Sequence, residues 1–238
     1  MYRNMKTGEE TGRETVRIGR GLGRTLFWTF LLLALGPLSL VSSVSLYNAT
    51  ESLRSETAAI LRAAMEYQHT LIEKYFHEVD IGINLQSELL ANIGTMKKLN
   101  AALRKSGLLP TAFISTTDWE IINTENGGAL RAYQTAHAYQ DIYLIDMAGN
   151  VLYTATERHV GENIFVDNYA LRKMTSAYRT ALKTGRTALS DYGPHNNSFS
   201  LFLAKPLEDD ETGKEIGVLI FELPYKQVDS YIQNRSGL

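Results

Sequence analysis

The sequence contains no cysteine, which excludes disulfide bonds, thiolate-bound zinc, iron–sulfur clusters and a cysteine nucleophile. An excess of charge of one sign is also absent. The 24 basic and 26 acidic residues leave a net charge of -2, which argues against a nucleic-acid-binding protein with a basic face. With 44% hydrophobic and 21% charged residues, the 238-residue chain is neither disordered nor wholly embedded in a membrane.

Charge is missing altogether from one stretch near the N-terminus. Thr25–Thr50 contains no charged side chain, and as a helix its middle part, Leu26–Tyr47, rises about 33 Å, enough to cross the hydrocarbon core. Trp28 and Tyr47 lie near the two ends of this part, where amphipathic rings favour the membrane interface. We therefore predict a transmembrane helix over residues 26–47.

The flanks of this helix predict its orientation. Residues 1–25 contain six basic and three acidic residues, so the positive-inside rule places this lead in the cytoplasm and the chain after the span outside the inner (cytoplasmic) membrane. The alternative is a cleaved signal peptide, because Ser43-Val44-Ser45 offers small residues at a suitable spacing. The long charged lead and the long apolar run favour the single-pass anchor.

Residues 48–110 have helical periodicity and form a predicted stalk. Apolar residues recur at steps of three, four or seven, which gathers them on one stripe: Leu53, Ile60, Ala64, Tyr67, Leu71, Tyr75 and Val79. The pattern resumes after Gly82, so we expect an interruption there. The stripe has two open interpretations, packing against its own domain or a homodimer seam that transmits motion.

The remaining residues, 111–238, predict an α+β domain. We expect a loose helical connection over 111–139, broken at Asn123–Gly128, then a hairpin of strands 142–145 and 151–154. A helix over 167–185, strands at 187–191, 199–205 and 215–222, and a last helix from about Pro224 follow. These elements predict a five-stranded, mainly antiparallel sheet with flanking helices.

Several segments carry a resemblance to a known family. Asp141–Tyr153 resembles the first hairpin of the Cache domains, which are PAS-like extracytoplasmic sensors of bacterial chemoreceptors (methyl-accepting chemotaxis proteins) and sensor kinases. The resemblance continues through Ser190–Tyr192, Ala204–Pro206 and Gly217–Phe221, and Leu61–Val79 resembles the stalk of such receptors. Residues 231–238 resemble the point where double-module members continue into a second module, so we expect the sensor domain 111–238 to be truncated at its C-terminal end.

The resemblance implies a ligand pocket among the strand from Phe199, the Asp191 loop and the helix 167–185. Its expected apolar walls are Tyr143, Tyr153, Tyr169 and Phe202, and its expected polar contacts are Arg172, Asp191, Tyr192 and Lys205. Asp191 would accept from a ligand ammonium and Arg172 would hold a carboxylate. The alternatives are core packing for the aromatic residues, a turn cap for Asp191 and solvated positions for Arg172 and Lys205. The closely spaced Arg, Trp and Tyr set of amino-acid-binding Cache domains is not evident, which argues against an amino-acid ligand.

The sequence does not indicate an enzyme. Asp191, His195 and Ser198 lie close together, but no Gly-x-Ser-x-Gly elbow accompanies them. Glu73 and His77 share a helix face, but two ligands are too few for a metal site, and no cofactor is implied.

We expect a membrane-anchored extracytoplasmic sensor of a small molecule, of the chemotaxis type, with ligand binding coupled to helix motion. Its expected partners are the ligand, the membrane and a second copy bound through the stalk, without nucleic acid. The alternative is a partner-binding or assembly domain of a membrane complex that binds no small ligand.

Overall fold

The computed structural model describes residues 20–166, 171–191, 193–195, 198–224, 226 and 229. The chain divides into two compact units, Met1–Arg62 and Ala63–Leu238. The last helix, expected from about Pro224, falls mainly outside the described residues.

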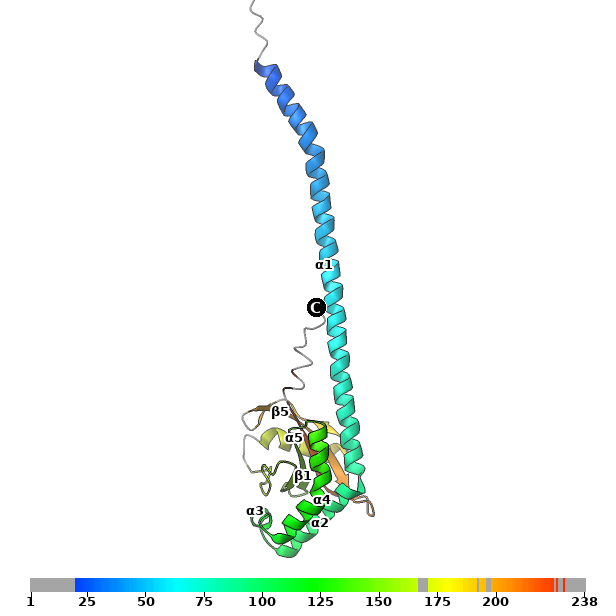
Figure 1. The fold of residues 1–238 in the computed structure, drawn as a ribbon, viewed down its shortest axis with the longest axis vertical. Coiled ribbons are helices and arrows are strands. Elements are labelled where there is room, and N and C mark those ends of the chain that lie inside the picture. The colour runs from blue at the N-terminus through cyan, green and yellow to red at the C-terminus, as the bar shows by residue number, and fades with distance from the viewer. Residues whose placement is uncertain are drawn as a thin grey trace, which may run out of the picture. The chain divides into compact units, whose positions relative to one another are not determined.

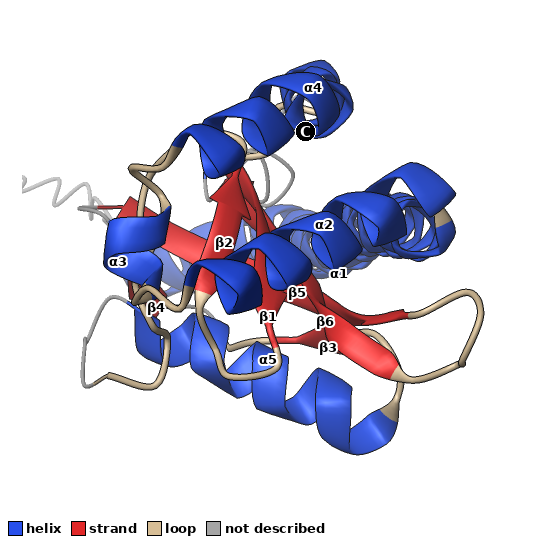
Figure 2. Cartoon of the chain, turned by 90° about the horizontal axis from the view of Figure 1, so that it is seen from below, coloured by secondary structure: helices blue, strands red, loops and turns tan. Residues whose placement is uncertain are grey.

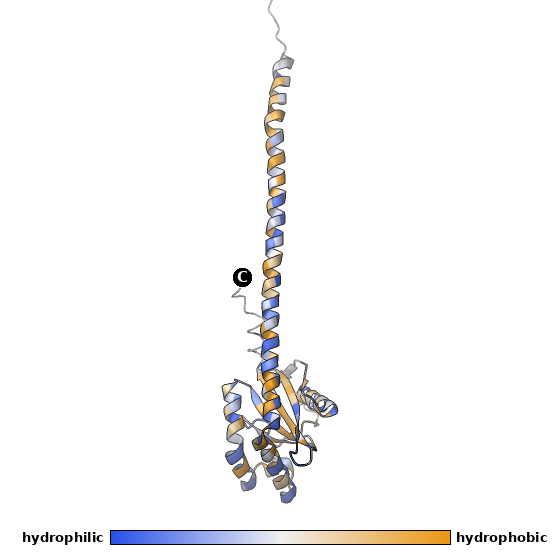
Figure 3. Cartoon of the chain, turned by 90° about the vertical axis from the view of Figure 1, so that its right-hand side faces the viewer, coloured by the Kyte–Doolittle hydropathy of each residue, from blue (hydrophilic) through white to orange (hydrophobic). Residues whose placement is uncertain are grey.

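The first unit holds the apolar part of helix α1 (Arg20–Glu88) (Figure 1). Within the described residues, α1 is the one helix long and apolar enough to cross a membrane, and its apolar residues are concentrated in its first part (Figure 3). Hydroxyl groups there donate back to the preceding turn, from Thr29 Oγ1 to Thr25 O at 2.9 Å and from Ser43 Oγ to Ser39 O at 2.7 Å. Such internal bonds suit a helix surrounded by hydrocarbon.

The interruption predicted near Gly82 lies instead at Leu89. Leu89 is extended, with φ -70° and ψ 118°, and separates α1 from α2 (Leu90–Ser106). Gly82 is buried inside α1, and a Cβ atom on it would overlap the hydroxyl oxygen of Tyr133. Glycine is therefore explained at this position by the close approach of another helix rather than by a break.

The break predicted at Asn123–Gly128 is also absent. After the short helix α3 (Pro110–Phe113), helix α4 (Thr117–Ala136) runs through this stretch, capped at its start by Thr116. Inside α4, Arg131 reaches back past Gly127, and its Nη1 donates to Asn123 Oδ1 at 3.0 Å. A Cβ on Gly127 would lie 3.1 Å from the same Nη1, so here too glycine makes room for a neighbouring side chain.

The strands form one antiparallel sheet. Its strands are β1 (Asp141–Asp146), β2 (Val151–Thr154), β3 (Ala188–Leu189), β4 (Gly193–His195), β5 (Ser198–Glu208) and β6 (Glu215–Pro224). The order is β2-β1-β6-β5-β3, and β4 also pairs with β5. The predicted α+β class with an antiparallel sheet is confirmed, although the third predicted strand shortens to β3 and the following loop contributes β4.

The two faces of the sheet are covered by different helices (Figure 2). Helix α5 (Arg172–Thr184), which ends at Gly185 with φ 61°, covers one face through Met174, Ala177 and Tyr178. We call this the α5 face. The last turns of α1, together with α2 and α4, cover the opposite face, which we call the α2 face. Both faces of the sheet are therefore buried.

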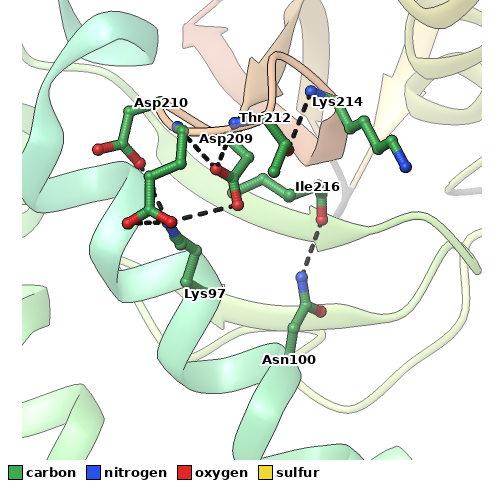
Figure 4. A network of polar contacts seen from close by, with 8 residues as sticks. Lys97, Asn100, Asp209, Asp210, Thr212, Lys214 and Ile216 are labelled. Atoms are coloured by element: carbon green, nitrogen blue, oxygen red, sulfur yellow. Dashed lines mark hydrogen bonds and ion pairs between the residues drawn. The ribbon is translucent and has the colours of Figure 1, made fainter.

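A salt-bridge network fastens α2 to the hairpin between β5 and β6 (Figure 4). Lys97 Nζ lies 3.3 Å from Asp209 Oδ2 and 3.1 Å from Asp210 Oδ1, and Asn100 Nδ2 donates to Ile216 O at 2.9 Å. Backbone N–H donation from Glu211 is the main cause that lowers the pKa of Asp209. Because Lys97 neutralises these carboxylates, we assign the cluster a structural role.

Candidate functional site

A cluster of polar side chains occupies one end of the α5 face. Apolar residues such as Ile145, Val218 and Ala204 line the part of this face that packs under α5. Towards the start of β1 and the end of β6, polar residues replace them. We call this cluster the polar patch, and it comprises Asp141, Tyr143, Thr154, Ser200 and Glu222, all buried.

The strand register places these residues side by side. Asp141 is directly opposite Glu222 in the β1–β6 pair, and Tyr143 is directly opposite Thr154 in the β1–β2 pair. Directly paired residues project from the same face of a sheet, with Cβ atoms about 4.5–5.5 Å apart. Four of the five side chains therefore come together through the strand pairing alone.

Glu222 is at the centre of the patch. Tyr143 donates its hydroxyl to Glu222 Oε2 at 2.6 Å, and Ser200 Oγ lies 2.7 Å from Oε1. Ser200 Oγ is also 3.1 Å from Gln140 Oε1. Burial raises the pKa of Tyr143 well above its ordinary value, and the neighbouring Glu222 adds to this effect. Tyr143 therefore stays protonated and remains a donor.

Asp141 is a second buried carboxyl group on the same face. Its Oδ1 accepts from Ile142 N at 2.8 Å and from Thr156 N at 3.1 Å, and the Thr156 hydroxyl donates to Oδ2. Burial raises the pKa of Asp141 despite these donors, and Glu222 raises it further. Removal from water disfavours the charged form of a carboxyl group. Ionisation of Asp141 in the patch is therefore less favourable than ionisation of an exposed aspartate.

The buried hydroxyl group of Thr154 has no hydrogen-bond partner among the described residues. Its side chain is buried, and Oγ1 makes no hydrogen bond to any part of the chain that the structure describes. A buried hydroxyl without a hydrogen bond costs about 1–3 kcal/mol. Thr154 Oγ1 therefore offers a donor and an acceptor on the same face as the two carboxyl groups.

The patch has the chemistry to bind a cationic or hydroxyl-bearing group. Two carboxyl groups supply acceptors, and the Thr154 hydroxyl supplies both functions. Among the described residues, no group of three His, Cys, Asp or Glu side chains has a geometry that could hold a metal ion.

The structure brings only part of the predicted pocket together. Tyr143, a member of the patch, and Phe202, which pairs with Glu222, are buried on the α5 face. Tyr153 and Lys205 lie on the α2 face. Tyr153 pairs with Leu144 and donates to Gly127 O at 2.7 Å, and Lys205 pairs with Leu219. Successive residues of a strand point to opposite faces, which separates these two from Tyr143.

The other predicted residues are exposed or lie outside the described residues. Arg172 is exposed at the start of α5. The Asp191 side chain is 92% exposed and lies 3.6 Å from Lys173 Nζ through its Oδ2. Tyr169 and Tyr192 fall outside the residues that the structure describes.

Sequence reasoning missed four members of the patch: Asp141, Thr154, Ser200 and Glu222. The two carboxyl residues had a detectable signal. Glu222 ends an otherwise apolar run, Val218–Phe221, and Asp141 begins another, Ile142–Ile145. A charged residue within a strand buried on both faces is unusual and marks a position that packing alone does not explain.

Two grooves lie on the side of α2, away from the patch. The larger, about 560 Å³, is lined by residues that include Lys97, Arg104 and Met147. The smaller, about 370 Å³, is lined by Ser87, Ile93 and Lys205 among others. Of the predicted binding residues, only Lys205 lines either groove, so the two grooves and the patch are separate places on the domain.

Neither a family profile nor a curated protein sequence matches this chain. Solved structures do match. The sensor domain of the histidine kinase DctB from V. cholerae is 17% identical, with a TM-score of 0.50, over 78% of this chain and 61% of that chain. The ligand-binding domain of the Campylobacter jejuni chemoreceptor Tlp3 with L-valine is 19% identical, with a TM-score of 0.39, over 71% and 67%. The E. coli DcuS sensor domain is 17% identical, with a TM-score of 0.35, over 59% and 98%.

The match to DctB shows the fold. The described domain has the fold of the DctB sensor domain, a PAS-like α+β fold, as the resemblance in the sequence predicts. The DctB structure is the sensor domain of a histidine kinase, and the Tlp3 structure is the ligand-binding domain of a chemoreceptor. The chain spans 61% of the length of the DctB sensor domain.

Proposed function

We propose that this chain is a membrane-anchored extracytoplasmic sensor of a small molecule, and that its ligand binds at the polar patch. The observation that carries the proposal is the pair of buried carboxyl groups, Asp141 and Glu222, placed directly opposite each other on one sheet face. Well-packed apolar residues in place of buried ionic groups are often neutral or stabilising. The presence of two adjacent buried carboxyl groups therefore favours a binding role.

The charge of the patch indicates the ligand class. An ammonium or other cationic group bound near Glu222 and Asp141 would offset the repulsion between the two carboxylates. Phe202, buried on the same face, supplies an apolar wall. Binding sites commonly combine apolar walls with a few polar groups that fix orientation. We infer a small ligand with a cationic group.

A packing route supports coupling of the ligand to α1. Phe221 immediately precedes Glu222 on β6 and projects to the α2 face, where its ring centroid lies 4.9 Å from that of Tyr139 and 5.8 Å from that of Tyr133. The hydroxyl of Tyr133 in turn lies against Gly82 of α1. A ligand that shifts β6 would therefore move a contact of α1, provided that it binds the two arrangements with different affinity.

The anchor follows from the apolar part of α1. With the basic lead in the cytoplasm, as the positive-inside rule predicts, the sheet domain is extracytoplasmic and meets solutes outside the cell membrane. The proposal places the chain in a receptor of the chemotaxis or sensor-kinase type, where α1 carries the signal towards the membrane.

A thermal-shift screen of the full chain in lipid nanodiscs tests the proposal. The panel contains amines, amino acids, dicarboxylates and neutral sugars. Free ligand at about 100 times its dissociation constant adds roughly 2.7 kcal/mol to the free energy of unfolding. We expect a saturable shift from an ammonium-bearing compound, and we expect Glu222→Gln to abolish it.

Lys205→Met is the matched control, because it also removes one charge but on the α2 face. It should leave the ligand-induced shift unchanged. A shift that survives Glu222→Gln but disappears in Lys205→Met would move the site to the smaller groove. A folded chain that responds to no compound would favour the assembly domain without a small ligand.

A further inference from the structure

A short segment after β2 has an unusual backbone beside the polar patch. Residues 156–159, which we call the strap, lie between backbone hydrogen bonds that Ala155 and Gly161 make to the sheet. Within the strap, Glu157 and His159 both have left-handed backbones, with φ 62° and φ 60°. Residues other than glycine rarely adopt this conformation, and it persists where the surrounding structure holds it. The contacts of the strap must therefore explain its shape.

Arg158, between the two left-handed residues, supplies these contacts. It is exposed, but its Nη2 donates to Gln140 O at 3.0 Å and its Nε donates to Thr156 Oγ1 at 3.0 Å. A guanidinium group presents its N–H donors in a rigid fork, so it can bridge two acceptors from different segments. The side chain of Arg158 therefore fastens the strap to the residue that precedes β1.

Both acceptors of Arg158 are themselves bonded to the two carboxyl-bearing residues of the patch. On one side, the Thr156 hydroxyl donates to Asp141 Oδ2. On the other side, Gln140 N donates to Glu222 O at 2.8 Å. Each carboxyl-bearing residue is thus connected to the guanidinium group through a single intervening residue. Arg158 lies at the edge of the patch where β1 and β6 meet.

The charge of Arg158 also acts on the interior of the patch. Burial raises the pKa of Tyr143, and the positive charge of Arg158 works against this effect. Arg158 therefore supplies a counter-charge to a cluster in which Asp141 and Glu222 lie directly opposite each other. Contacts of exposed charged groups contribute little to stability, so an incoming cation can replace Arg158.

We propose that the strap closes the polar patch in the absence of ligand, with Arg158 as a built-in cation that a cationic ligand must displace. This inference rests on the proposed function, because it concerns the same site. Release of Arg158 lets Glu157 and His159 leave the left-handed conformation, which favours opening. The contact is autoinhibitory, because the apparent affinity for the ligand is reduced in proportion to the fraction of chains whose strap is open.

Binding of methylguanidinium tests whether Arg158 competes for the patch, because this ion carries the same charged group as the arginine side chain. Its affinity is measured from the saturable thermal shift of the full chain in lipid nanodiscs, at millimolar concentrations of the ion. We expect Arg158→Met to bind it about three- to fivefold more tightly than the wild type. Arg104→Met is the matched control, since it removes another exposed arginine, on α2, and should bind the ion as the wild type does.

Two substitutions at His159 test the contribution of the left-handed backbone. His159→Gly and His159→Ala both remove the imidazole, but only glycine adopts φ 60° without strain. Strain favours the open strap, so His159→Ala should bind methylguanidinium about two- to threefold more tightly than His159→Gly. In the Arg158→Met background this difference should vanish, because no built-in cation is left to displace.

The outcomes separate failure of this inference from failure of the proposed function. Tighter binding in Arg158→Met but not in Arg104→Met, abolished by adding Glu222→Gln, would support both. Equal binding by the wild type and Arg158→Met, lost in Glu222→Gln, would keep the patch as a cation site and refute autoinhibition, as would an equal gain in Arg104→Met. Binding that survives Glu222→Gln, or no binding by any variant, would refute the cation site and the inference with it.

Discussion

Gly82 offers a sharp test of how α1 packs on the sheet domain. Alanine is about 0.8–1.0 kcal/mol more favourable than glycine inside a helix, so Gly82→Ala would ordinarily stabilise α1. In this structure the added Cβ would overlap the hydroxyl oxygen of Tyr133. The Tyr133 ring has little freedom to move, because it packs against His137 at 4.2 Å and Phe221 at 5.8 Å between ring centroids.

The expected change in the free energy of unfolding is the difference between the overlap with Tyr133 and the gain in helix propensity. Overpacking of a buried position costs about 1–3 kcal/mol, and the restricted ring puts Gly82→Ala in the upper half of that range. After subtraction of the helix gain, we expect a net destabilisation of about 1–2 kcal/mol. Tyr133→Phe removes the clashing oxygen and leaves Cζ at 3.7 Å from the new Cβ, which is an ordinary contact. In that background Gly82→Ala should stabilise by up to about 1 kcal/mol.

Fluorescence of Trp119 during unfolding provides the assay. Trp119 is buried in the domain and donates from Nε1 to Leu152 O at 2.8 Å, and Trp28→Phe removes the other tryptophan. Gly128→Ala, which meets no atom within 4 Å, is the control and should stabilise. The packing argument is wrong if Gly82→Ala stabilises as much as Gly128→Ala, or if Tyr133→Phe does not reverse its sign.

Three further predictions concern buried groups of the domain. The pKa of Asp141 is raised above 3.8 in the folded state. The free energy of unfolding should therefore fall as pH rises from 3.8 through the folded-state pKa. Asp141→Asn should flatten this slope when unfolding is measured as a function of pH. Gly127→Ala should destabilise by about 1 kcal/mol, because its Cβ would lie 2.5 Å from the Tyr153 ring. Tyr178→Phe should lower the free energy of unfolding in urea by about 1 kcal/mol. The change removes the 2.8 Å hydrogen bond from the Tyr178 hydroxyl to Asp146 O, but that carbonyl still accepts from Gly149 N.

Each of these has an outcome that would contradict it. An unchanged pH slope in Asp141→Asn would mean that Asp141 does not hold a proton more tightly in the folded state. Stabilisation by Gly127→Ala would mean that Tyr153 does not approach the helix closely. A neutral Tyr178→Phe would mean that water or another group replaces the hydroxyl of Tyr178.

Local sequence signals predicted the strands well. The Ile142–Ile145 and Val151–Thr154 runs, separated by the Met147–Asn150 turn, form the hairpin of β1 and β2. Glycine was the main source of error, because Gly82 and Gly127 make room for tyrosine rings that come from distant parts of the chain. A contact with such a partner leaves no local signal, so the helices looked interrupted where they continue.

For the candidate site, too, the features set within one strand could be predicted, and those set by contacts between distant strands could not. Phe202 and Lys205 are three residues apart on one strand, so alternation alone places them on opposite faces. The pairing of Asp141 with Glu222 joins strands far apart in sequence and depends on the order β1-β6. Strand order is set by packing of the whole domain, and the central pair of the patch could therefore be found only in the structure.

The most direct test of the central claim is hydrogen–deuterium exchange of the full chain with and without the compound that gives the largest thermal shift. We predict added protection at residues 140–143, 154–156, 200–202 and 221–223, where the polar patch lies. Residues 97–104 of α2, which line the larger groove, should be unchanged. Protection of α2 with none at β1 and β6 would contradict the assignment of the ligand to the α5 face.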